Sequence, residues 1–366
     1  MIIHFLFLFL IVLISGFYQK LLDKKVIVIN GEITLKSKKN LLSNAILIII
    51  FILMILFIGL RDISIGTDTS TYVSLFWNEN FGFSGIEILP SIISYIIRIF
   101  SDKYFIYLCI LSLICLIGVF SNINKYYFST QMFLFLYITS YCYLYSTSAT
   151  RFFCAFSMIM LSFKYMIDNN DRKVLLFLII ASMFHTSALI FIPIYYFTKL
   201  KLNHKIMLTV TTWLLVFIIC FEIIDISFLF RGELTSKYIY ILENRNQIGG
   251  FSLFINIAIL FFAYFYRPII TFYKKDFDFF IKLQIISIII EFCSYAYRAI
   301  WYFKFPVWFI VPIILLNLKF NRLRKREYFI IYSLIILIYI FYYYWMLKVS
   351  LATHNFLEYK FNLMWN

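Results

Sequence analysis

Several ionisable residues in this sequence stand inside or beside long apolar segments, where a charge is costly. They are Arg61, Asp62, Asp68, Arg151, His185, Glu291 and Arg298. Ionisable side chains at membrane depth usually mark a ligand or ion path. One arginine at a helix end is more often an anchor that reaches for the interface. Three arginines without matching carboxylates, however, suit an anion, because the guanidinium binds phosphate or pyrophosphate through two parallel hydrogen bonds. We therefore expect Arg61, Arg151 and Arg298 to form an anion site.

His185 and Asp68 are the candidates for proton transfer. His185 precedes two hydroxyl residues in the middle of an apolar run, and histidine is a natural general base near neutral pH. The alternative is a packing residue. Asp68 follows Gly66 and Thr67 in a turn, and its alternative role is to cap a short helix that runs through Phe76. Tyr72, four residues on, would share its face.

Two patterns of other enzyme classes can be set aside. Asp276 and Asp278 form a DxD, which many nucleotide-sugar transferases use to hold a divalent ion, but it follows Lys274 and Lys275 at the start of an apolar segment. Helix capping explains it more simply. Nucleotide-binding glycine loops, zinc-protease motifs and paired cysteines are absent from the sequence.

The elements that must position these residues are membrane helices. Sixty-three per cent of the residues are apolar, 22% are aromatic and 14% are charged, against roughly a quarter charged in a soluble domain. We expect an all-α, polytopic transmembrane bundle with about 10–12 crossings, in which residues 1–366 form a single integral membrane domain. The apolar runs are 2–18, 41–60, 86–100, 104–120, 128–145, 152–166, 174–197, 206–224, 251–266, 279–295, 301–318 and 328–347. The first lacks the flanks of a cleaved signal and is expected to be a retained helix.

The placement of charge predicts the orientation. The net charge is +15, and most basic residues lie in short segments beside apolar ends: 20–39, 164–173, 199–205, 267–275 and 319–326. The positive-inside rule puts these segments in the cytoplasm and explains them without nucleic acid. Residues 61–87 and 231–250 are then outer loops, and the tail after Lys348 is expected to lie outside as well. The three arginines converge on that outer side.

Two runs cannot be simple crossings on this topology. The run 86–100 contains Pro90 and Arg98, is short, and is expected not to cross. The run 174–197 starts and ends beside basic segments, so we expect a broken or re-entrant helix pair around His185. Non-helical backbone at that depth is tolerated only where it is buried in protein or lines a wet cavity.

These residues together resemble the Wzy-type (EpsG-like) bacterial polysaccharide polymerases. The elements that carry the resemblance are Gly59 to Arg61, Gly66 to Asp68 with Tyr72, Arg151, Phe184 to Ala188, and Arg298 with Tyr302 and Phe303. The resemblance extends from about Leu41 to Tyr302. The chain departs from the pattern at Phe152, where a glutamine usually follows the arginine, and in the distance between Arg298 and the Tyr-Phe pair.

The resemblance implies a membrane glycosyltransferase at the outer face of the bacterial cytoplasmic (inner) membrane, facing the periplasm or exterior. A growing glycan on undecaprenyl pyrophosphate would be transferred to a new lipid-linked repeat unit, giving O-antigen, capsule or exopolysaccharide. Arg61, Arg151 and Arg298 would hold the pyrophosphate leaving group. His185 or Asp68 would activate the acceptor hydroxyl.

The same resemblance implies the remaining partners. Tyr72 and Tyr302 would contact the glycan, and a chain-length regulator and a flippase of the same pathway would be partners. Because the outer loops lack a cluster of carboxylates, we expect no metal and no other cofactor.

Two alternatives from other classes stay open at this point. A lipid-linked oligosaccharide flippase or other transporter should show paired halves and matched broken helices, which this sequence lacks. A polysaccharide-modifying membrane acyltransferase would share the buried histidine and arginines, but its soluble acyl donor should enter from the cytoplasmic side.

Overall fold

The computed structural model describes residues 1–29, 32–38, 41–77, 88–125, 130–200, 209, 249–292, 304–321, 324–354 and 359–361. Six helices of this part of the chain are long and apolar enough to cross a bilayer. They are α1 (Ile2–Leu21), α2 (Leu41–Gly59), α5 (Tyr104–Lys125), α8 (Thr150–Ile167), α13 (Gly249–Tyr266) and α16 (Lys325–His354). Shorter apolar helices are α4 (Ile88–Phe100), α6 (Thr130–Thr139) and α15 (Pro306–Phe320). The polytopic helical fold is thus confirmed. The run 206–224 lies outside the described residues, so the total of 10–12 crossings stays a prediction.

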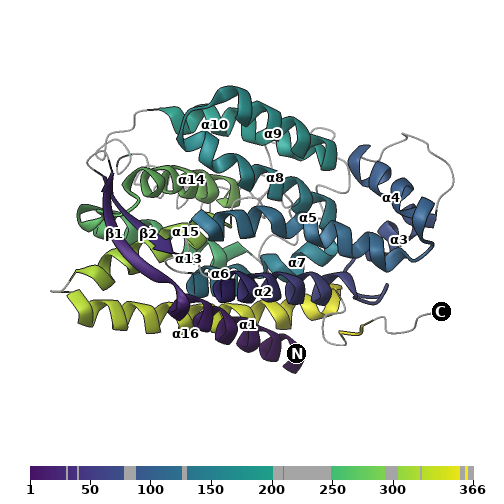
Figure 1. The fold of residues 1–366 in the computed structure, drawn as a ribbon, viewed down its shortest axis with the longest axis horizontal. Coiled ribbons are helices and arrows are strands. Elements are labelled where there is room, and N and C mark those ends of the chain that lie inside the picture. The colour runs from purple at the N-terminus through teal and green to yellow at the C-terminus, as the bar shows by residue number, and fades with distance from the viewer. Residues whose placement is uncertain are drawn as a thin grey trace, which may run out of the picture. The chain divides into compact units, whose positions relative to one another are not determined.

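The helices fall into two compact units. The first comprises residues 1–192, 270–274 and 312–366, and the second residues 193–269 and 275–311. In the first unit α1 packs on α2, α2 on α5, α5 on α8, and α8 on α9 (Asp171–Phe184). Figure 1 shows this succession from α1 at the bottom to α9 at the top. The short helices α6 and α7 (Cys142–Ser148) are buried almost throughout within it.

Close contact between α5 and α8 depends on a small residue. Gly118 of α5 donates its backbone N–H to the Ser157 hydroxyl of α8 at 2.8 Å. A β-carbon at Gly118 would overlap the backbone of Ser157. Small residues let membrane helices approach in this way. The pair therefore fixes the position of α8 against α5, and the first turn of α8 belongs to the site below.

The second unit joins its helices through polar side chains. Asn256 of α13 donates to the Glu291 carboxylate of α14 (Lys274–Phe292), and it accepts from the Gln284 amide at 3.0 Å. Of the two aspartates of the DxD, Asp276 lies in the first turn of α14, and the Asp278 carboxylate pairs with Arg267 at 2.9 Å. Arg267 lies in the short helix η5 (Arg267–Ile269). Buried polar groups need such partners in a low-dielectric interior.

Two segments differ from the sequence expectation. The run 128–145 is not one helix, because α6 ends at Thr139 and Tyr141 takes a left-handed backbone conformation, with φ of 69°. The Tyr143 hydroxyl, just beyond, donates to the Met54 carbonyl of α2 at 2.8 Å, so tertiary contacts support the break. The basic segment 20–39 holds an antiparallel hairpin, β1 (Asp23–Ile29) and β2 (Glu32–Lys38). Apart from this hairpin the described chain is all-α, as expected.

Two other expectations about the helices fit the structure. The helix of α9 ends at Phe184, His185 is extended, and the 3₁₀ helix η2 (Thr186–Ile190) leads into α10 (Phe191–Lys199). The predicted break at His185 is therefore confirmed, while its re-entrant course stays a prediction. Helix α4 has 13 residues, or about 20 Å of length, well short of a bilayer core of roughly 30 Å.

Candidate functional site

The turn after α2 is fixed by Arg61, whose side chain is completely buried. Its guanidinium donates to the Ile58 carbonyl at 2.8 Å and to the Thr69 hydroxyl at 3.0 Å. It also donates to the Thr147 carbonyl at 3.1 Å and the Thr150 hydroxyl at 3.2 Å. Burial lowers the pKa of the Arg61 guanidinium, but arginine keeps its charge in proteins. The residue thus ties the end of α2 to the junction between α7 and α8.

The turn itself lies closely against that junction. Gly66 has φ of +83°, and a β-carbon there would lie 2.9 Å from the Thr147 carbonyl oxygen. The Thr67 backbone N–H donates to the Ser148 hydroxyl at 3.2 Å. Glycine is therefore required twice here, for its backbone conformation and for the close approach. The Gly-Thr-Asp motif is a contact surface of the fold as well as a candidate for chemistry.

Tyr72 interacts with both a negative and a positive side chain of the site. It belongs to α3 (Thr69–Trp77), is almost completely buried, and its hydroxyl donates to the Ser148 carbonyl at 3.4 Å. Burial raises the pKa of Tyr72 to about 12, the Asp68 carboxylate adds to the rise, and Arg151 opposes it. The Arg151 guanidinium carbon lies 5.7 Å from the centre of the Tyr72 ring, within the range of a cation–π contact. Asp68 and Arg151 therefore act on the same phenol.

Asp68 is half-buried, and its carboxylate accepts the Thr67 hydroxyl at 3.2 Å. It directly precedes α3, as the expected turn and short helix require. The neighbouring Asp62 serves the turn, since Ser64 donates to it from its backbone N–H at 2.9 Å and from its hydroxyl at 2.7 Å. These hydrogen bonds hold the pKa of Asp62 below its ordinary value.

Arg151 lies in the first turn of α8, where the helix dipole presents partial positive charge. Its side chain is half-buried, in contrast with the enclosed Arg61. A cation beside a helix start is unfavourable in itself, and a bound anion would offset that cost. Such a position favours an anion.

His185 reaches the same end of α8 through Phe152. The two rings meet edge to face with centres 5.7 Å apart. The Nδ1 atom of His185 accepts the Ser187 backbone N–H at 3.3 Å and lies 2.7 Å from the Ser187 hydroxyl. Because a backbone N–H can only donate, Nδ1 is the acceptor, and the proton of the neutral ring is on Nε2. His185 in this arrangement is a hydrogen-bond donor at Nε2.

The structure thus brings Arg61, Asp68, Tyr72, Arg151 and His185 to one region of the first unit, around the start of α8. Arg298 and Tyr302, the other predicted site residues, lie outside the described residues.

Sequence reasoning missed a C-terminal segment that also contacts this region. The Asp62 N–H donates to the Lys360 carbonyl at 3.0 Å, Arg61 pairs with Phe361 in an isolated β-bridge, and the Tyr359 hydroxyl donates to the Phe57 carbonyl. Burial raises the pKa of Tyr359. Nothing in the residue types of this segment indicated the contact. The contact depends on the fold of the whole chain, which returns residues 359–361 to the end of α2.

Comparison with known proteins identifies the family. Searches of curated proteins and of solved structures gave no match. The sequence model of the EpsG family matches residues 44–361, a range that holds every candidate site residue named above and most of the membrane helices. The chain therefore belongs to the EpsG family of polysaccharide-polymerase-like membrane proteins.

Proposed function

We propose that this protein polymerises undecaprenyl-pyrophosphate-linked oligosaccharide repeat units into a surface polysaccharide at the outer face of the bacterial cytoplasmic membrane. Membership of the EpsG family supports a polymerase. The single observation that carries the chemistry is that Arg151 and Asp68 both act on Tyr72 near the start of α8. An anion-binding group and a proton acceptor are what glycosyl transfer from a pyrophosphate requires.

In the proposed reaction, an acceptor sugar hydroxyl attacks the anomeric carbon of the growing glycan. The bond between that carbon and the pyrophosphate oxygen breaks, and undecaprenyl pyrophosphate leaves with the electron pair. Arg151 and the N-terminal end of α8 stabilise the charge that develops on the leaving group. The hydroxyl proton passes to the Asp68 carboxylate, and the Nε2–H group of His185 donates a hydrogen bond to a phosphate or hydroxyl oxygen while keeping its proton.

The arginines then have different roles in this proposal. Arg61 donates to four protein acceptors, so we assign it the positioning of the Asp68 turn rather than direct contact with pyrophosphate. Arg151 is the ligand-facing arginine. Arg298 remains a predicted pyrophosphate ligand and Tyr302 a predicted glycan contact. Tyr72 is almost completely buried, so we assign it the positioning of Arg151 through its ring rather than direct contact with the glycan.

The decisive experiment replaces Arg151 in the producing strain. In a deletion strain complemented with the Arg151→Ala variant, we expect lipid-linked single repeat units to accumulate. Chains of more than one repeat unit should be absent. Loss of one transition-state donor costs about 10²–10³ in rate. Arg172→Ala is the matched control, because Arg172 is an exposed arginine in the first turn of another helix, α9.

The glycan pattern also separates the alternative functions. Repeat units that accumulate on the inner leaflet would indicate a flippase, and full-length polymer without an ester would indicate an acyltransferase. A normal polymer ladder with Arg151→Ala would refute the role assigned to Arg151.

A further inference from the structure

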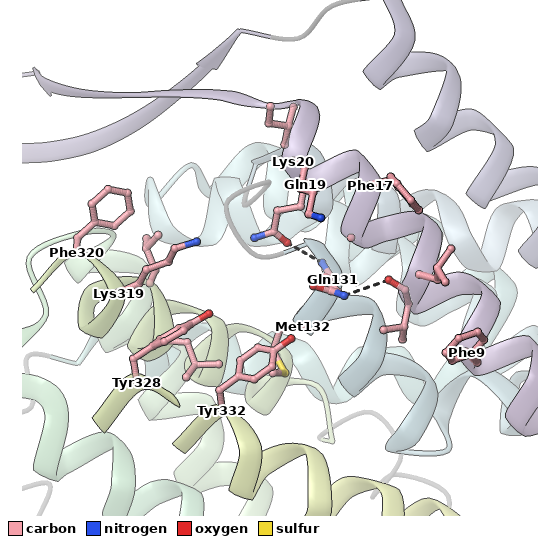
Figure 2. Close-up of a pocket in the computed structure, with 16 residues that line it drawn as sticks. Phe9, Phe17, Gln19, Lys20, Gln131, Met132, Lys319, Phe320, Tyr328 and Tyr332 are labelled. Carbon is pink, nitrogen blue, oxygen red and sulfur yellow. Dashed lines mark hydrogen bonds between the residues drawn. The ribbon is translucent and has the colours of Figure 1, made fainter. Parts of the chain in front are cut away.

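A cavity of about 700 Å³ lies in the first unit, away from the candidate site. Its walls come from α1, the start of α6, the end of α15 and α16 (Figure 2). This volume is within the range of roughly 300–1,000 Å³ that is usual for small-molecule pockets. The cavity shares no lining residue with the site around Arg151. The cavity is therefore a feature separate from that site.

One part of the cavity is cationic and rich in hydrogen-bond donors. Lys20 lies in the last turn of α1, and Lys319 lies in the last turn of α15. Figure 2 shows the Lys319 ammonium and the hydroxyls of Tyr328 and Tyr332 directed into one opening. The residues that line the cavity in the described part of the chain include no aspartate or glutamate. Two lysines and two phenols in a lining without a carboxylate are complementary to an anion.

The other part is apolar and continues onto an exposed stripe. Phe9, Leu13 and Phe17 line the cavity and follow one another at four-residue intervals on α1. Their exposed fractions are 66%, 42% and 58%. On a membrane helix such a stripe faces hydrocarbon chains. The cavity thus joins a cationic end to a lipid-facing surface.

The wall between α1 and α6 is held by hydrogen bonds, so the cavity is formed in advance. The Gln131 amide donates to the Val12 carbonyl at 3.2 Å, and its backbone N–H donates to the Gln19 side chain at 3.2 Å. Gly16 permits this approach, because a β-carbon there would lie 2.9 Å from the Gln131 side-chain nitrogen. A fixed wall lowers the cost of ordering a ligand.

We propose that this cavity binds the phosphate headgroup of an anionic glycerophospholipid of the membrane. Lys20, Lys319 and the two tyrosines hold the phosphate, and the acyl chains lie along Phe9, Leu13 and Phe17. The positive-inside rule places Lys20 and Lys319 beside cytoplasmic segments, and basic pockets between membrane helices on that side bind anionic headgroups. The bound lipid is separate from the glycosyl-transfer site and would support the packing of α1 on α16.

Native mass spectrometry of the full-length purified protein tests the proposal with phosphatidylglycerol as the probe. We expect one phosphatidylglycerol to remain bound where phosphatidylcholine does not. The double variant Lys20→Ala/Lys319→Ala should bind it about tenfold or more weakly, because each basic residue near a lipid surface contributes roughly a factor of five. Lys20→Arg/Lys319→Arg should restore binding.

The matched control removes two exposed lysines from another basic segment, as Lys164→Ala/Lys173→Ala. Equal loss of phosphatidylglycerol from this control would overturn the proposal, because it would indicate attraction by general surface charge. Equal retention of phosphatidylcholine would also overturn it. Competition by millimolar inorganic phosphate as effective as that by the lipid would indicate a free-anion site instead. Circular dichroism of each variant in phosphatidylcholine checks that the fold is kept.

Discussion

At the scale of single residues, the two nitrogens of His185 decide which group accepts the proton. Nδ1 is occupied by the Ser187 backbone N–H, so the neutral ring offers a proton at Nε2 rather than a lone pair. A general base needs that lone pair. Asp68 has no such constraint, because an ionised carboxylate is an acceptor only. The arrangement favours Asp68 as the base and His185 as the donor.

This assignment predicts opposite results for two conservative variants. His185→Gln places an amide N–H near the position of Nε2, so we expect its polymerisation rate to stay within about tenfold of that of the parent protein. Asp68→Asn removes the proton acceptor, so its polymerisation rate should fall by a factor of about 10²–10⁴. The measurement is the rate of polymer growth with purified protein and lipid-linked repeat units. His185→Ala is the control, since it lacks both nitrogens. Full activity of Asp68→Asn together with an inactive His185→Gln would reverse the assignment.

The hydrogen-bond partners of Arg61 could not be predicted from the sequence, although the importance of the residue could. The type of the residue and its place at the end of an apolar run predicted an important arginine. Three of its hydrogen bonds, however, are to Thr69, Thr147 and Thr150, and two of those residues are more than 80 positions away in the sequence. No local pattern contains that information.

At the scale of elements, hydrophobic length and charge predicted the helices better than their interruptions. The break at His185 was predicted because its run begins and ends beside basic segments, a constraint that comes from the membrane. The break at Tyr141 was not predicted, because Tyr141 is not a residue that favours a left-handed conformation and tertiary contacts such as that of Tyr143 with Met54 support it. The hairpin in 20–39 was not predicted, because the many lysines of this segment indicated a charged loop.

The packing of α5 on α8 predicts the effect of a substitution at Gly118. In a helix interior Gly→Ala normally stabilises by about 1 kcal/mol. At Gly118 the added methyl meets the Ser157 backbone, which cannot move aside as a side chain can. We therefore expect Gly118→Ala to destabilise by about 1–3 kcal/mol and to reduce polymerisation by displacing the start of α8.

Thermal unfolding of the purified protein in detergent measures this effect. Gly16→Ala is the control, because its new methyl meets only the end of the Gln131 side chain and displaces one hydrogen bond to Val12, so its melting temperature should fall by less than that of Gly118→Ala. A melting temperature of Gly118→Ala at or above that of the parent protein would contradict the packing argument.

At the scale of the whole molecule, orientation in the membrane decides which substrates can reach the site. The charge distribution put both the 61–87 loop and the C-terminal tail outside, and the structure places residues 359–361 directly against the turn at Arg61. Two segments predicted to share a face therefore lie together. This agreement constrains their relative position, and the absolute side stays a prediction of the positive-inside rule.

Labelling of introduced cysteines in intact cells tests the absolute side. Ile63 is 42% exposed beside the turn, and Lys173 is exposed at the start of α9, in a basic segment. A membrane-impermeant thiol reagent should label Ile63→Cys in intact cells and Lys173→Cys only after lysis. The parent protein, which has six cysteines of its own, gives the background to be subtracted. The reverse pattern would put Asp68 and Arg151 in the cytoplasm, where lipid-linked units are assembled before export, and outer-face polymerisation would then be wrong even if Arg151 proved essential.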